Sequence, residues 1–208
     1  MNRFVLWFVK ITGLIPALIC YRRKTYYVNK KNQNRKIKGS AIIISNHKSL
    51  MDYPLYMYTF FKRSLRTLTA EVIYQKGKLM SWLLKKIGCI RVNRDEYDFE
   101  FMSETVDILN KGGVALVFPE GKLPDDSDLL PFKPSFVYLA LESKSPIIPV
   151  WTNGKYMKKE RAKIVIGEKI YLHEMYDESK SEKENLDYLT NYVRDYISSL
   201  GERLNEKE

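Results

Sequence analysis

The sequence predicts a single α/β domain with a central, mostly parallel or mixed sheet flanked by helices, together with an N-terminal membrane-associated helix. Three observations predict this fold. The chain has 208 residues, a length that suits one domain with a substantial core. Hydrophobic residues make up 45% and charged residues 29%, which is typical of a folded globular protein. Short β-rich runs alternate with helical patterns along the chain, as they do in α/β proteins.

The N-terminal segment is apolar almost throughout its first 20 residues and is followed at once by a basic cluster at 22–24. No small-residue cleavage site precedes Tyr21, so the segment does not resemble a secretory signal. Its borderline length and the charge of Lys10 disfavour a spanning helix. We expect residues 1–24 to form an anchor that lies in or dips into one leaflet, and residues 25–208 to form the α/β domain. An N-terminal helix packed into the core is the alternative.

The charge of the chain predicts an anionic partner. Lys and Arg number 35 against 25 Asp and Glu, a formal net charge of +10, and residues 22–38 contain no acid. Anionic membrane lipid fits this balance together with the apolar N-terminus. Nucleic acid does not, because the aromatic residues form no recognisable nucleic-acid-binding motif. Cys20 and Cys89 make neither a disulfide nor a metal framework, so we expect the cytoplasmic face of a membrane.

Strands and helices alternate along the domain. The expected strands are Thr25–Val28, Ala41–Ser45, Leu65–Thr69, Cys89–Val92, Val114–Phe118, Ile147–Trp151 and Lys163–Ile166. The expected helices are Leu50–Lys62, Ile73–Lys86, Phe99–Asn110, Ser135–Glu142 and, at the C-terminus, Glu182–Leu204. The runs at 42–44 and 114–118 are apolar without alternation, which indicates strands covered on both faces.

Polar residues come directly after several of these strands. They are Asn46 and His47, Asn93 and Arg94, the run from Pro119 to Lys122, and the run from Thr152 to Gly154. Ligands of open α/β sheets bind beyond the carboxyl ends of the strands. We therefore expect a base, an arginine, a carboxylate with a glycine, and a lysine to meet at one edge of the sheet.

His47 and Asp52 form the candidate catalytic pair. Ser49 and Asp52 have the spacing of a helix capping box, which gives Asp52 a purely structural explanation. In the catalytic interpretation, Asp52 holds one ring nitrogen of His47 and stabilises the cation formed when the other nitrogen takes a proton. No nucleophile elbow is present, so the proton would come from a substrate hydroxyl. The sequence indicates no metal site, because it has no Cys cluster and no second histidine at helical spacing.

Three further candidates could bind an anionic substrate. Arg94 ends an expected strand, where a guanidinium can clamp a phosphate through two parallel hydrogen bonds. Glu120 can accept a hydrogen bond from Arg94 or from a substrate hydroxyl. Gly121 allows backbone N–H groups to approach an anion closely. The plain alternatives are a solvated charge at a strand end and an ordinary strand-to-loop turn.

These residues resemble the motifs of the glycerol-phosphate acyltransferase superfamily, and specifically the 1-acyl-glycerol-3-phosphate acyltransferases (lysophosphatidic acid acyltransferases). The motif N-H-x-S-x-x-D appears at 46–52, G-x-I-x-V-x-R at 88–94, F-P-E-G at 118–121, and an apolar pair followed by Pro-Val at 147–150. Each motif alone is weak, but all four occur in the family's order and spacing. The resemblance covers about residues 40–170.

The resemblance implies direct acyl transfer without a cofactor. His47, oriented by Asp52, would deprotonate the free hydroxyl of 1-acyl-glycerol-3-phosphate. That oxygen would attack the thioester of an acyl-CoA or acyl-carrier protein, and the product would be phosphatidic acid. The residues that would hold the phosphate and glycerol end of the acceptor are Arg94, Glu120, Gly121 and Lys122.

The sequence departs from the family pattern in two places. Lys122 and Leu123 stand where F-P-E-G usually continues with Thr or Ser and then Arg, and Ser135 stands where a glycine is usual. A lysine supplies a point charge but not the bidentate geometry of an arginine. An acyltransferase for another lysophospholipid or an amino-lipid therefore stays an alternative, as does a non-catalytic lipid-binding protein of the same fold.

Overall fold

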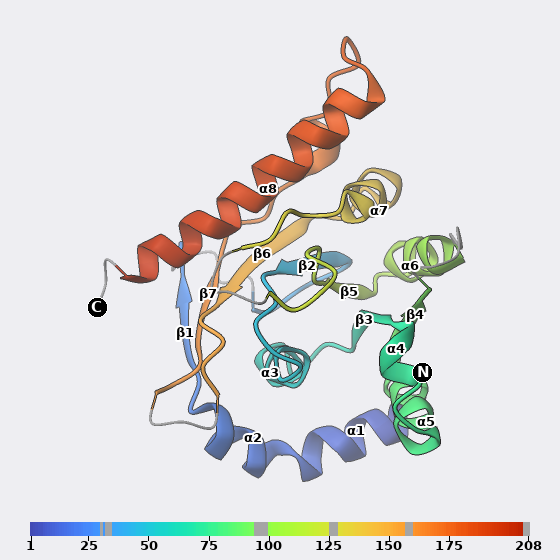
Figure 1. Cartoon of the computed structure of the whole chain (residues 1–208), viewed down its shortest axis with the longest axis vertical. Helices are drawn as coiled ribbons and strands as arrows, with labels where there is room; N and C mark the ends of the chain where they lie inside the picture. Colours follow the sequence, from blue (N-terminus) through green and yellow to red (C-terminus); the bar gives the residue numbers. More distant parts are fainter. Residues whose placement is uncertain (30, 32–34, 94–99, 125–128, 157–159, 206–208) are drawn as a thin grey trace.

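The computed structural model describes residues 1–29, 31, 35–93, 100–124, 129–156 and 160–205 (Figure 1). The strands form one sheet in the order β1-β7-β6-β2-β5-β3-β4. They are β1 (Lys24–Tyr27), β2 (Ala41–Ser45), β3 (Leu65–Ala70), β4 (Ile90–Val92), β5 (Val114–Val117), β6 (Ile147–Thr152) and β7 (Lys163–Ile166). The α-helices are α1 (Arg3–Thr12), α2 (Leu14–Tyr21), α3 (Asp52–Thr59), α4 (Glu71–Tyr74), α5 (Lys78–Ile87), α6 (Glu100–Asn110), α7 (Ser135–Ser143) and α8 (Glu182–Asn205).

The sheet is mixed, because β6 and β7 pair antiparallel while the other paired strands are parallel. β2 lies between β5 and β6, and Ile44 is level with Val117 on one side and Pro149 on the other. The carboxyl ends of these three strands therefore meet at one edge of the sheet. This is the edge at which the sequence predicted a site.

Helices cover both faces of the sheet, with α3, α2 and α1 on one side and α6, α7 and α8 on the other (Figure 1). Successive residues of β2 point to opposite faces, so Ile43 belongs to one buried cluster and Ile42 and Ile44 to another. All three isoleucines are fully buried. This confirms that the apolar run without alternation is a strand covered on both faces.

The predicted single α/β domain with a mixed sheet is confirmed, and each strand agrees with its prediction to within a residue at either end. The helix predicted over Ile73–Lys86 is wrong, since α4 and α5 are separate helices. The break lies at Gly77, whose φ of 146° is a conformation that side chains rarely adopt. The helix predicted over Leu50–Lys62 is shorter at both ends, as α3 spans Asp52–Thr59.

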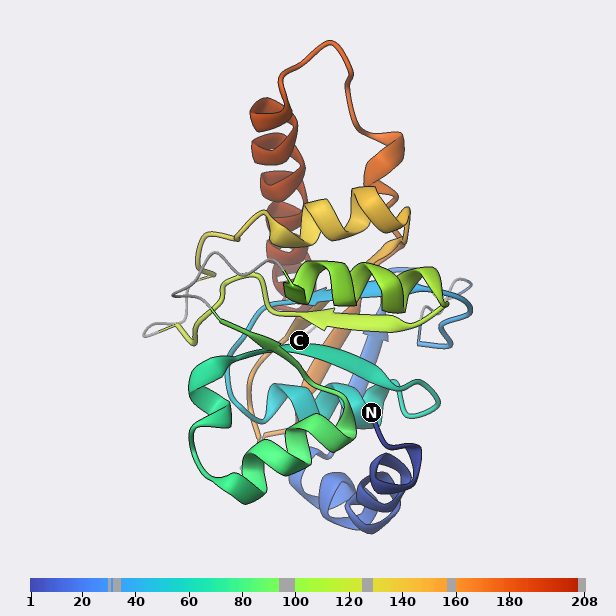
Figure 2. The same cartoon turned by 90° about the vertical axis from the view of Figure 1, so that its right-hand side faces the viewer.

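The N-terminal segment forms two helices rather than one. α1 and α2 meet at Gly13 and are bent by 51°. The hydroxyl of Tyr58 donates a hydrogen bond to the Val9 carbonyl (3.1 Å), and a Cβ on Gly13 would lie 2.0 Å from that hydroxyl. A glycine at the junction therefore allows Tyr58 to reach the backbone of α1. Figures 1 and 2 both show this helix pair beneath the domain, at the end remote from α8.

Lys10 forms hydrogen bonds that connect α1 to the domain. Its side chain is only 1% exposed, and its ammonium group donates to the carbonyls of Phe61 (2.8 Å) and Arg63 (2.7 Å). Burial lowers the pKa of Lys10 to about 8. The charge of Lys10, in the middle of the apolar segment, thus faces the protein and does not interrupt the outer face of the helix.

The outer face of the helix pair is apolar and exposed. The exposed large side chains of α1 and α2 are Phe4, Trp7, Phe8, Ile11, Leu14, Ile15, Leu18 and Ile19. We call these residues the apolar face. In the part of the chain that the structure describes, no single helix is long and apolar enough to cross a bilayer, and α1 with α2 meets that condition only as a bent pair.

Candidate active site

The site begins where β2 ends. Asn46 is fully buried, and its side chain bonds to both backbone groups of Thr152, donating to the carbonyl (2.9 Å) and accepting from the N–H (2.8 Å). The side-chain amide of Asn46 thus makes the same pair of hydrogen bonds to β6 that a further strand residue would make. These bonds hold the loop after β2 against β6. The next residue, His47, is therefore held at the carboxyl edge of the sheet.

His47 and Asp52 are brought together as predicted. Nδ1 of the imidazole lies 2.8 Å from Oδ2 of the carboxylate, and Asp52 is fully buried. Because Asp52 occupies Nδ1, Nε2 is the ring nitrogen that can exchange a proton with a substrate. The His47 ring stacks on Phe118 at a centroid distance of 4.3 Å, which holds the imidazole plane. The His47 side chain is 16% exposed, enough for access from outside.

The backbone around His47 is folded onto the same carboxylate. Oδ2 of Asp52 also accepts from the N–H groups of Lys48 (2.7 Å) and Ser49 (2.9 Å). The Asp52–Ser49 contact is one half of the predicted capping box. The other half is absent among the described contacts, since the Ser49 hydroxyl accepts from the N–H of Met51 and the helix begins at Asp52. The carboxylate thus contacts the backbone at the start of α3 and also the ring of His47, which are the two roles that the spacing allowed.

Tyr156 completes the environment of Asp52 and was missed in the sequence. Its hydroxyl donates a hydrogen bond to Oδ1, the carboxylate oxygen that does not face His47. Burial, followed by the negative charge of Asp52, raises the pKa of Tyr156 far above its ordinary value, so the hydroxyl keeps its proton. Thr152 lies 3.2 Å from the same hydroxyl. In this region the sequence predicted only the run at 152–154, just before this tyrosine, to lie at the edge of the sheet.

Glu120 is buried, and its carboxylate binds backbone N–H groups. It is 5% exposed, and its two carboxylate oxygens accept from the N–H of His47 (2.6 Å) and of Leu130 (3.0 Å). Burial raises the pKa of Glu120 above its ordinary value, and these two backbone hydrogen bonds oppose that shift. The carboxylate therefore fixes the backbone of His47, while Asp52 holds its ring. A direct contact of Glu120 with substrate stays a prediction.

The remaining candidates lie around the same loop. Gly121 has a φ of 73°, and its N–H donates to the carbonyl of Phe118 (3.1 Å), which closes a tight turn. A Cβ at Gly121 would lie 3.1 Å from the side chain of Lys133. Lys122 is exposed beside this turn. Arg94 lies outside the described residues.

A cavity of about 400 Å³ adjoins the site. It shares Phe118, Pro119 and Gly121 with the loop after β5. The rest of its described wall is largely apolar and includes Leu68, Val92, Phe101, Met102, Val117 and Tyr138, and Lys133 is the one basic residue among the described residues that line it. An apolar cavity next to a base can hold a hydrocarbon chain close to a reacting group.

A buried carboxylate that orients a histidine, at the carboxyl edge of an α/β sheet, defines a protein equipped for proton transfer from a substrate hydroxyl. A model of the Acyltransferase family matches residues 25–153, more than half of the chain. The chain belongs to this family, which confirms the resemblance carried by the four sequence motifs.

Named relatives agree with this assignment. The 1-acyl-sn-glycerol-3-phosphate acyltransferase of Limnanthes alba is 34% identical over 123 residues, which are 58% of this chain and 43% of that protein. The chain thus spans less than half the length of this relative. The protein of the same name from Borreliella burgdorferi is 27% identical over 176 residues, or 80% of this chain and 68% of that protein.

One solved structure shares the fold. The crystal structure of the 1-acyl-sn-glycerophosphate (LPA) acyltransferase PlsC from Thermotoga maritima matches with a TM-score of 0.66 and 20% identity. The match covers 96% of this chain and 80% of that one.

Proposed function

We propose that this chain transfers an acyl group from a thioester to the free hydroxyl of 1-acyl-glycerol-3-phosphate, which gives phosphatidic acid. The observation that carries the proposal is the 2.8 Å contact between Nδ1 of His47 and the buried carboxylate of Asp52. A non-catalytic lipid-binding protein has no use for a histidine oriented in this way. The names of the relatives support the choice of acceptor.

The reaction is a direct displacement. Nε2 of His47 takes the proton of the acceptor hydroxyl, and the oxygen attacks the thioester carbonyl. The new C–O ester bond forms as the C–S bond breaks, and the departing thiolate receives the proton from the imidazolium. Asp52 stabilises that cation, and Tyr156 and two backbone N–H groups keep the carboxylate in place. No cofactor is required, and the acyl donor is an acyl-CoA or an acyl-carrier protein.

Substrate binding uses both sides of the loop after β5. Lys122, the turn at Gly121 and Arg94 are assigned to the phosphate of the acceptor, with Glu120 holding the loop that carries His47. The apolar cavity beside Phe118 offers a place for an acyl chain. The apolar face of α1 and α2 supports a location on the membrane that contains the acceptor, and we assign the protein to the cytoplasmic side of that membrane.

The test is a product analysis. Purified protein is incubated with lysophosphatidate in mixed micelles and with either acyl-CoA or acylated carrier protein, and thiol release and lipid products are measured. Thiol release that depends on the acceptor, and that is lost in His47→Ala, is the expected result. Equal rates for wild type and His47→Ala would refute the proposal.

A second candidate acceptor is favoured by one observation. Lys122 and Leu123 replace the residues that usually follow F-P-E-G in the family, so the group that binds the acceptor's phosphate differs here. A panel of lysolipids with phosphate, phosphodiester and amino headgroups in the same assay separates the two acceptors. A preference for a headgroup without a phosphate monoester would favour the second.

A further inference from the structure

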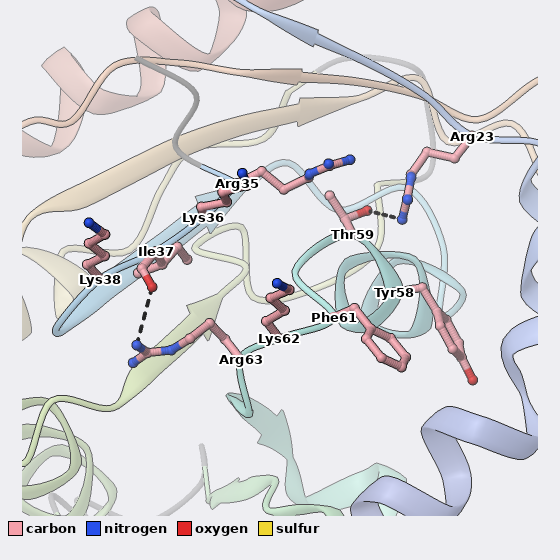
Figure 3. Close-up of a pocket in the computed structure, with 10 residues that line it drawn as sticks. All are labelled: Arg23, Arg35, Lys36, Ile37, Lys38, Tyr58, Thr59, Phe61, Lys62 and Arg63. Atoms are coloured by element: carbon pink, nitrogen blue, oxygen red, sulfur yellow. Dashed lines mark hydrogen bonds between the residues drawn. The ribbon is translucent and has the colours of Figure 1, made fainter. Parts of the chain in front are cut away.

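A second cavity, of about 320 Å³, lies away from the candidate active site (Figure 3). It is lined by the end of α3, by the loop after α3, by the segment that precedes β2 and by Arg23 between α2 and β1. We call it the basic cavity, because six of its ten lining residues are Arg23, Arg35, Lys36, Lys38, Lys62 and Arg63. Its other lining residues are Ile37, Tyr58, Thr59 and Phe61, and none of the ten is acidic.

The positive charge of the basic cavity is not compensated by described residues. None of its six cations forms an ion pair within the described part of the chain. Arg23 donates to the hydroxyl of Thr59 (3.2 Å), and Arg63 donates to the carbonyls of Ile37 (3.3 Å) and Gly39 (2.9 Å). These neutral partners fix the two guanidinium groups without cancelling their charge.

The burial of Arg23 and the positive charge of a neighbouring arginine both affect its pKa. Burial, and then the positive charge of Arg35, lowers the pKa of Arg23 below its ordinary value. Figure 3 shows the side chains of Arg23 and Arg35 both extending toward Thr59. Like charges held this close repel one another, and an anion bound between them removes that repulsion.

The basic cavity is separate from the site at His47. Lys38 and Arg63 come just before β2 and β3, so they lie at the amino edge of the sheet, whereas His47 follows the carboxyl end of β2. Arg23 precedes β1, which starts at the edge of His47, but its guanidinium donates to Thr59, the last residue of α3, whereas Asp52, the partner of His47, is the first. β2 has five residues, and a strand of that length spans roughly 17 Å. An anion in the basic cavity is therefore not the phosphate of an acceptor engaged at His47.

The basic cavity shares a wall with the helix pair. Phe61 packs edge-on against Trp7 of the apolar face, with ring centroids 5.5 Å apart. Tyr58, another lining residue, bonds to the backbone of α1 at Val9. A lipid whose chains lie in the membrane beside the apolar face can therefore bring its headgroup to this cavity.

We infer that the basic cavity is a second lipid site, which binds the phosphate monoester headgroup of an anionic lipid such as phosphatidic acid. A phosphate monoester carries about −1.5 to −2 charges near pH 7, and the phosphodiester of most anionic lipids carries about −1. Six cations without an acid match the higher charge. The inference rests on the membrane placement and the product given under the proposed function, because the ligand is then the lipid that the enzyme makes.

The test compares vesicles of phosphatidylcholine that contain either phosphatidic acid or phosphatidylglycerol, adjusted to the same zeta potential. The variant Lys36→Gln with Lys62→Gln removes two exposed cavity charges without touching Arg23 or Arg63. Two basic residues at a membrane surface justify an expected loss of roughly tenfold in affinity. We expect that loss on phosphatidic acid vesicles and a much smaller one on phosphatidylglycerol vesicles.

The matched control is Lys180→Gln with Lys183→Gln, two exposed lysines near the start of α8, far from the helix pair (Figure 1), and it should bind both vesicles like wild type. An equal loss on the two vesicle types would overturn the inference, since it would indicate general attraction to negative charge. Loss of CoA binding, without loss of preference for phosphatidic acid, would assign the cavity to a nucleotide phosphate and also overturn it. Acyl transfer in neutral micelles is measured in parallel, and its absence would count against the proposed function alone.

Discussion

Tyr156 and Asp52 are 104 residues apart in the sequence, and the tyrosine hydroxyl donates a hydrogen bond to Oδ1 of the buried carboxylate. The other oxygen, Oδ2, accepts from His47 and from two backbone N–H groups. The tyrosine therefore fixes the rotation of the carboxylate, and through it the direction of the imidazole. Tyr156 acts as a positioning residue, because it reaches the imidazole only through Asp52.

Tyr156→Phe tests that role. A hydrogen bond to a charged group is worth about 1.5–3 kcal/mol, so we expect kcat to fall roughly tenfold to a hundredfold with the KM for the acceptor nearly unchanged. The control is Tyr176→Phe, which removes an exposed tyrosine hydroxyl elsewhere. A rise in KM at constant kcat would show that Tyr156 contacts substrate instead of positioning Asp52.

Asp52→Asn should be more damaging than Tyr156→Phe. The amide would present N–H groups to the His47 ring and to the backbone donors at Lys48 and Ser49, which favours the wrong tautomer of the imidazole. We expect kcat to fall by about 10²–10⁴-fold, the range that a positioned general base contributes. The chain's other histidine provides the control, since His173→Ala should leave kcat unaltered.

Glu120→Gln tests whether the carboxylate supports the loop at His47. Both oxygens accept backbone N–H groups, so an amide NH₂ would oppose one of them inside a buried site. We expect the free energy of unfolding to fall by about 1–3 kcal/mol and kcat to fall with it. Circular dichroism during urea unfolding measures the first effect. Unaltered stability with a raised KM for the acceptor would instead support a direct contact between Glu120 and substrate.

Lys10 predicts a pH dependence of stability. Its pKa falls from 10.5 to about 8 on folding, so between these values the unfolded chain binds more proton than the folded one. The free energy of unfolding should therefore rise as the pH increases from about 8 toward 10.5. Lys10→Met should lack this rise when urea unfolding is followed across that range. A parallel pH dependence in the two proteins would contradict the prediction.

The apolar face predicts membrane binding. Ile15→Ser with Ile19→Ser removes two exposed side chains one helical turn apart, each of which contributes about 1.5–3 kcal/mol when buried. Recovery with floated neutral vesicles should fall strongly. The matched control on α8 is Tyr188→Ser with Tyr192→Ser, which should float like wild type. Equal flotation of both variants would show that the apolar face is not the membrane contact.

The parts that the sequence predicted well are local. The strands follow from apolar runs, and the His47–Asp52 contact spans five residues, so a helix start is enough to bring the two side chains together. Glu120 and Tyr156 are distant in the chain from His47 and Asp52, and only the paired strand ends bring them together. No spacing rule predicts such contacts.

The contacts of Lys10 are a second example of contacts that the sequence does not predict. In the sequence it is a charge inside an apolar run, and hydropathy assigns it a cost. In the structure two carbonyls in the loop after α3 accept hydrogen bonds from its ammonium group, which no pattern within residues 1–24 indicates. Arg94 lies outside the described residues, so its predicted role as a phosphate clamp stays a prediction.

The antiparallel pairing of β6 and β7 determines where the N-terminal helices join the sheet. Because β1 runs parallel to β7, Lys24 starts at the same edge of the sheet as the loop of His47. The end of α2 thereby reaches the site, where the Tyr21 hydroxyl donates to the Met51 carbonyl (3.1 Å) and its ring packs edge-on against Tyr156. Had β7 run the other way, Tyr21 would lie roughly a strand length, about 15 Å, from this tyrosine. Reversing one strand therefore brings the last residue of α2 against the aromatic ring whose hydroxyl holds the Asp52 carboxylate.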